Sequence, residues 1–175
     1  MLLRTASILA ASLTMAGCAT MGTADSAPLA TAYLINQAGN SVGTAELIER
    51  GTAHALRLRV TGMPAGAHGF HLHTAGVCAT PSFESAGGHL NPSGQQHGSL
   101  NPQGKHLGDL PNINVPANGQ LSTEVMLNGS RDELVRQLFD ADGTAVMIHA
   151  QPDDYRSDPT GGAGARIACG VLNRV

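Results

Sequence analysis

Two histidines lie one residue apart in the stretch GFHLH, residues 69–73. In a β-strand, residues i and i+2 face the same side, so His71 and His73 would present two imidazoles together. Two neighbouring imidazoles are costly to bury without partners, and imidazole is a ligand for copper, zinc, nickel and iron. The pair therefore predicts that a metal ion lies beside the two rings.

Further side chains of the metal-ligand type follow along the chain. His89, His97 and His106 lie in glycine-rich sequence with little periodicity, and Asp109 comes three residues after His106. His149 ends a later apolar run, AVMIH. Glycine-rich backbone can bend around an ion. The set exceeds the four ligands of one tetrahedral zinc site, so either two metals bind or several of these histidines are structural.

A single-zinc enzyme of the carbonic anhydrase type is the nearest alternative, because such a site also uses a His-x-His pair. It would leave three histidines and Asp109 without a role. Two other histidines are not expected to be ligands. His54 is interpreted as an ordinary surface or core residue, and His68 as a structural hydrogen-bonding residue.

The composition limits the classes of function. The chain has 175 residues, a formal net charge of −3 and a single lysine, Lys105. A nucleic-acid-binding surface needs a basic stripe, so we expect no nucleic-acid partner. The length predicts one domain, and the absence of tryptophan predicts a largely aliphatic core. The sequence does not fix the oligomeric state, and a homodimer is the assembly to test.

The N-terminal segment MLLRTASILAASLTMAGC has the outline of an export signal, with a basic residue, an apolar run and small residues before Cys18. Its ending resembles a bacterial lipoprotein signal, in which the cysteine is lipidated and becomes the mature N-terminus. We therefore expect a signal peptide over 1–17, a flexible tether over 18–29 and lipid attachment at Cys18. A plain signal peptide cut nearby is the alternative. Ala19 favours a periplasmic protein held at the outer membrane.

Three cysteines are an odd number for an exported protein. If Cys18 carries lipid, Cys78 and Cys169 remain to pair in an oxidising compartment. Two unpaired buried thiols are the alternative.

Short apolar stretches separated by turn residues predict an all-β domain over 30–175. HALRLRV alternates strictly, with Leu56, Leu58 and Val60 on one face. Only SRDELVRQLF resembles a helix, with Ser130 as N-cap and Glu133 three residues later. The expected fold is a Greek-key β-sandwich or barrel of Ig-like architecture, with at most one short helix. Residues 76–108 and 150–165 are expected to be two long functional loops. The other strand candidates are TAYLINQ, SVGTAELIE, LSTEVML, AVMIHA and ARIACGVL.

Six stretches in order, GFHLH, AGGHLNP, QQHG, KHLGDL, VMIHA and GGAGARIACGVL, resemble the copper/zinc superoxide dismutase family, in particular its exported bacterial members. The resemblance runs from about residue 30 to 175. It implies one copper and one zinc per chain, and superoxide as the substrate. The implied copper ligands are His71, His73, His89 and His149. The implied zinc ligands are His89, which bridges the two metals, with His97, His106 and Asp109.

The resemblance also implies a mechanism and three further roles. Copper would alternate between two oxidation states while superoxide is converted to oxygen and hydrogen peroxide, and His89 would carry a proton. Arg166 would bind the anion, Asp153 would tie a copper histidine to a zinc histidine, and a Cys78–Cys169 bridge would fix the loop under the metals. A solvated loop residue is the alternative for Asp153.

One departure concerns the attraction of the anionic substrate. The loop 150–165 contains no lysine, so a steering role is not carried over to it, and Lys105 is the remaining candidate. A protein that only binds or buffers copper and zinc at the envelope is the alternative function. The presence of Arg166 and of all four copper positions argues against that alternative.

Overall fold

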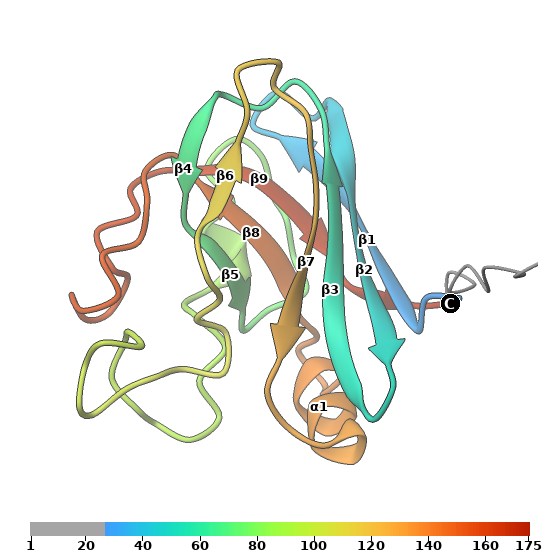
Figure 1. Ribbon diagram of the computed structural model, residues 1–175, viewed down its shortest axis with the longest axis vertical. Helices are drawn as coiled ribbons and strands as arrows, with labels where there is room; N and C mark the ends of the chain where they lie inside the picture. The colour runs from blue at the N-terminus through green and yellow to red at the C-terminus, as the bar shows by residue number, and fades with distance from the viewer. Residues whose placement is uncertain (1–26) are drawn as a thin grey trace, which may run out of the picture.

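A computed structural model describes residues 27–175 of the chain, which form ten β-strands, one α-helix and one short 3₁₀-helix (Figure 1). In chain order the elements are β1 Ala30–Asn36, β2 Ser41–Arg50, β3 Ala53–Val60, β4 Gly66–His68, β5 Phe70–His73, η1 Glu84–Ala86, β6 Ile113–Val115, β7 Leu121–Leu127, α1 Arg131–Leu138, β8 Ala145–His149, β9 Arg166–Val171 and β10 Asn173–Arg174.

Eight of the strands form one antiparallel sheet in the order β5-β8-β9-β1-β2-β3-β7, with β10 pairing to the start of β1. β4 and β6 form a separate pair, and β4 leads into β5 through Gly69. The long sheet is strongly curled, so that β8 and β9 cross β2, β3 and β7 at a wide angle (Figure 1). The expected all-β fold with one short helix is confirmed.

The aliphatic core lies inside the curl of the sheet. On β3 the alternation works as expected, because the side chains that face inward are fully buried: Leu56, Leu58 and Val60. Arg57 points to the outer side but is also covered, because Glu46 and Glu124 on the neighbouring strands form ion pairs with it. Cross-strand pairs of opposite charge therefore line the outer face of β2, β3 and β7.

The helix and the two long loops also lie where the sequence predicts them. Ser130 is the N-cap of α1 and its hydroxyl accepts from the N–H of Glu133 at 3.4 Å. Residues 76–108 contain only the three-residue η1, and 150–165 contain no strand. The short elements β4, β6, β10 and η1 were not predicted, since strands of two or three residues leave no periodic pattern.

The expectations for 1–17 and for Cys18 fall on residues outside the described part of the chain. Leu29, at the end of the expected tether, already donates its N–H to Leu47 O at 2.7 Å and packs against the core. Across residues 27–175, the structure contains no helix of the length and apolar character needed to cross a membrane.

Candidate metal centre

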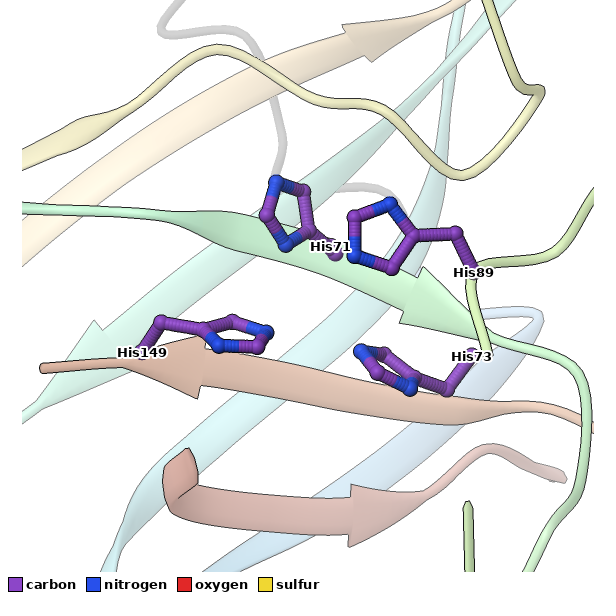
Figure 2. A group of neighbouring side chains, drawn as sticks. All are labelled: His71, His73, His89 and His149. Atoms are coloured by element: carbon purple, nitrogen blue, oxygen red, sulfur yellow. The ribbon is translucent and has the colours of Figure 1, made fainter. Parts of the chain in front are cut away.

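Four histidines form a compact group at one end of the curled sheet, which we call the four-histidine group: His71, His73, His89 and His149. β5 supplies two of them on one face, as the i, i+2 spacing predicts. β8, which pairs with β5, supplies His149 at its end, and the loop after η1 supplies His89. All four rings point toward a common space (Figure 2). The four potential ligand atoms lie within 4.8 Å of one another.

One nitrogen of each of these rings is buried and has no hydrogen-bond partner among the described residues: His71 Nδ1, His73 Nε2, His89 Nε2 and His149 Nε2. In each ring the other nitrogen faces an oxygen: His71 Nε2 to Asp153 at 2.8 Å, His73 Nδ1 to Gly87 O at 2.9 Å, His149 Nδ1 to Gly164 O at 3.1 Å and His89 Nδ1 to Asp109 Oδ1 at 2.8 Å. These oxygens act only as acceptors, so the nitrogens facing them carry the proton. The unpartnered nitrogens then carry lone pairs, and four lone pairs directed at one space fit a Cu(II) ion.

A second group shares His89 with the first and is called here the aspartate group: His89, His97, His106 and Asp109. The Nδ1 atoms of its three histidines lie 2.8, 3.0 and 3.0 Å from the same Oδ1 of Asp109. One oxygen has too few lone pairs for three donors, so this arrangement does not satisfy all three rings by itself. Three ring nitrogens and one carboxylate oxygen are the ligand set of a tetrahedral zinc site.

His89 is the residue that connects the two groups. Its Nε2 belongs to the four unpartnered nitrogens, and its Nδ1 lies 2.8 Å from Asp109. The two atoms point to opposite sides of one ring. His89 is therefore a member of both groups.

Asp153 lies between the two groups, and its side chain is fully buried. Oδ2 accepts from His71 Nε2 at 2.8 Å and Oδ1 accepts from His97 Nε2 at 2.9 Å. The neighbouring Asp154 is exposed and bonds only within its own loop. A side chain at Gly161, which has φ +64°, would put its Cβ 2.0 Å from Asp153 Oδ1 and 2.6 Å from His97 Nε2. Glycine at position 161 therefore keeps the space in which these bonds form.

Arg166 lies beside the four-histidine group because β9 pairs with β8 and sets Arg166 opposite His149. Its guanidinium donates to Phe83 O at 2.7 Å and to Gly87 O at 2.6 Å, the two residues that flank η1. A disulfide between Cys78 and Cys169 ties the same loop to β9, as the cysteine count predicts. The half-buried guanidinium is thus held in one orientation, with N–H groups left over for an anion.

Burial lowers the pKa of three of the rings, those of His73, His89 and His149. Burial, with the neighbouring histidines and Arg166 adding to it, lowers the pKa of His73 to about 2 and that of His149 to about 3. Burial also lowers the pKa of His89 to about 4, although Asp109 opposes the shift. For the carboxyl of Asp109, burial raises the pKa, but hydrogen bonds from His89 and Gly98 outweigh it and the pKa falls well below its usual value. Neutral imidazoles and an ionised carboxylate are the forms that bind metal ions.

Lys105, the remaining candidate for attracting the anion, lies beside Asp109. Its ammonium donates to the main-chain oxygen of Asp109 at 2.8 Å, on the side of the aspartate group. His68, expected to be structural, bonds through its two ring nitrogens to Pro64 O and His149 O, and so supports the end of β8.

Comparison of the domain with known proteins identifies its family. A family model described as copper/zinc superoxide dismutase (SODC) matches residues 41–172. The chain belongs to the copper/zinc superoxide dismutase family. It is 45% identical over 150 residues to superoxide dismutase [Cu-Zn] 2 of Aquifex aeolicus, covering 82% of this chain and 85% of that one. To superoxide dismutase [Cu-Zn] of Caulobacter vibrioides it is 40% identical over 149 residues, covering 82% and 84%.

Solved structures support the same family. A superoxide dismutase-like protein from Bacillus subtilis matches with a TM-score of 0.76 and 38% identity, covering 81% of this chain and 97% of that one. The expected enzyme class and its metals, copper and zinc, are confirmed through the family. Because the family includes proteins named only as dismutase-like, the two complete ligand groups of this chain carry the argument for activity.

Sequence reasoning missed the main-chain oxygens that hold the site. Gly87 O accepts from both His73 and Arg166, and Gly164 O accepts from His149. Asn112 was also missed, although its amide pairs with the main chain of Asp153 through two hydrogen bonds. The glycine content of both loops was the only signal for these positions.

Proposed function

We propose that this superoxide dismutase holds copper in the four-histidine group and zinc in the aspartate group, with His89 bridging the two ions. The observation that supports this most directly is the set of four buried ring nitrogens that share one space and lack any partner among the described residues. Unpaired buried polar atoms are costly, and four together are accounted for by an ion. When bound, copper supplies the one-electron chemistry that converts superoxide alternately to oxygen and to peroxide.

The chain's own residues then perform three tasks. Arg166 offers a fixed positive charge beside His149 and binds the small anion. His89 Nε2 is the atom at which a proton can be held and passed to the peroxide product, while Nδ1 stays in the aspartate group. Asp153 keeps the rings of His71 and His97 in the orientation that turns Nδ1 of His71 into the four-histidine group and Nδ1 of His97 into the aspartate group.

The deciding experiment measures metal content and superoxide turnover on the same protein sample. We expect one copper and one zinc per chain with fast turnover, and we expect His149→Ala to lose copper and turnover while keeping zinc. His54→Leu is the control, because His54 is buried in β3 outside both groups and neither of its ring nitrogens has a partner. Zinc alone without turnover in the wild-type protein would favour a buffering role and overturn the proposal.

We also propose that the chain is exported and anchored by lipid at Cys18. The disulfide supports export, because such bonds persist in oxidising compartments. Mass spectrometry of the mature N-terminus tests this, with Cys18→Ser as the comparison. A mature protein that begins at another residue and carries no lipid would contradict the proposal.

A further inference from the structure

The four residues of the aspartate group are closed to solvent to different degrees. The side chains of His97, His89 and Asp109 are 0%, 1% and 2% exposed, whereas that of His106 is 6% exposed. His106 has the most exposed side chain of the four, so it marks the side from which we expect an ion to approach.

Two surface cavities approach the group. One has a volume of about 240 Å³ and is lined by His106 itself, with Ser93, Met126 and Glu133 among the other residues. The second has a volume of about 130 Å³ and reaches Asp109, with Ser99 and Tyr155 in its wall. A divalent ion carries a shell of water, so the larger cavity is the better path.

The charges of the two cavities also differ. Lys105 lines both, and its ammonium is bonded to Asp109 O. Glu133, in the first turn of α1, is exposed and lines the larger of these two cavities but not the smaller one. A negative side chain raises the local concentration of a cation, and an ammonium lowers it. The carboxylate thus favours approach through the larger cavity.

We propose that zinc reaches its site through the cavity between α1, the end of β7 and the loop of His106, and that Glu133 attracts the ion on the way without being one of its final ligands. This inference rests on the proposed zinc site. It predicts that Glu133 changes the rate of zinc uptake and of zinc loss by the same factor, since it acts on the path and not on the bound state.

The test is stopped-flow uptake of Zn²⁺ by the metal-free, full-length protein, with equilibrium affinity measured separately by chelator competition. Glu133→Gln is expected to slow uptake about two- to five-fold at low ionic strength, with unchanged affinity and with the difference fading in high salt. Asp132→Asn is the matched control, because it removes an equal charge from the same helical turn but does not line the cavity. It should slow uptake clearly less.

Two substitutions that add a bulky side chain, one in each cavity, test the path independently of charge. Met126→Trp adds bulk in the larger cavity and is expected to slow both uptake and loss of zinc. Ser99→Trp adds bulk in the smaller cavity and is expected to change neither. Slowing by Ser99→Trp alone, or equal effects of Glu133→Gln and Asp132→Asn, would overturn the path. A wild-type protein that binds no zinc would overturn the proposed site, and the path with it.

Discussion

Asp153→Asn is the substitution that tests the link between the two groups. The native carboxylate accepts one ring N–H from each group, at 2.8 Å from His71 and 2.9 Å from His97, and it is completely buried. An asparagine of nearly the same size offers only one oxygen. Its NH₂ group would face one of the two ring N–H groups, and two donors cannot bond to each other.

The loss can be estimated from the bonds involved. A hydrogen bond to a charged group contributes about 1.5–3 kcal/mol, and the substitution removes the charge from both bonds and the acceptor from one. A loss of that size corresponds to about a 10- to 100-fold weaker binding of the ion held by the affected ring. If the NH₂ group faces His97, zinc affinity falls by that factor. If it faces His71, copper affinity falls instead.

Chelator competition on the fully loaded protein measures both affinities. Asp154→Asn is the control, because this exposed neighbour bonds only to Ser157 and Arg156 in its own loop. Its zinc and copper affinities should stay within about two-fold of wild type. If Asp153→Asn left both affinities unchanged, or if Asp154→Asn weakened them equally, the positioning role of Asp153 would be refuted.

Three further predictions concern acid, the disulfide and salt. The pKa values of His73 and His149 in the folded protein are about 2 and about 3, against 6.5 when unfolded, so below pH 6.5 the unfolded chain binds protons there and the folded chain does not. In urea unfolding of the metal-free protein, the free energy of unfolding should therefore fall by about 2 kcal/mol for each of the two residues between pH 7 and pH 5. An unchanged free energy of unfolding would contradict their burial as neutral rings. Replacing Cys78 and Cys169 together by alanine should lower the free energy of unfolding by about 4 kcal/mol, because the bridge joins residues 91 positions apart. An unchanged denaturation midpoint would argue against a native bridge. Turnover should fall less than about three-fold between low and physiological ionic strength, because the loop 150–165 lacks lysine. A steep fall in a salt series would contradict this expectation.

The main strands and the pairing of His71 with His73 could be predicted because they depend on spacing, whereas the two complete groups were implied by the family resemblance. The i, i+2 rule placed His71 and His73 on one face of a strand, and strict alternation gave the inward side chains of β3. The single helix was recognised from its cap, Ser130, and from the glutamate that follows three residues later. Each of these signals comes from side chains close together in the sequence.

The rest depends on contacts between distant parts of the chain. The resemblance named Asp153, but the contacts that hold it in place come from a distant part of the chain, because its main chain pairs with Asn112, about 40 residues earlier. The surroundings of Lys105 likewise could not be predicted, since its ammonium donates to the main-chain oxygen of Asp109. The main-chain oxygens that hold the rings of His73 and His149 have no signature in a sequence.

The use of main-chain oxygens has a consequence for any attempt to transplant the site. Gly87 O orients His73 and Arg166 together, and Gly164 O orients His149. Copying only the ligand side chains onto another β-barrel would therefore transfer the imidazole rings without the main-chain oxygens that orient them. A working transplant would need the two loop backbones and the disulfide between Cys78 and Cys169 as one piece.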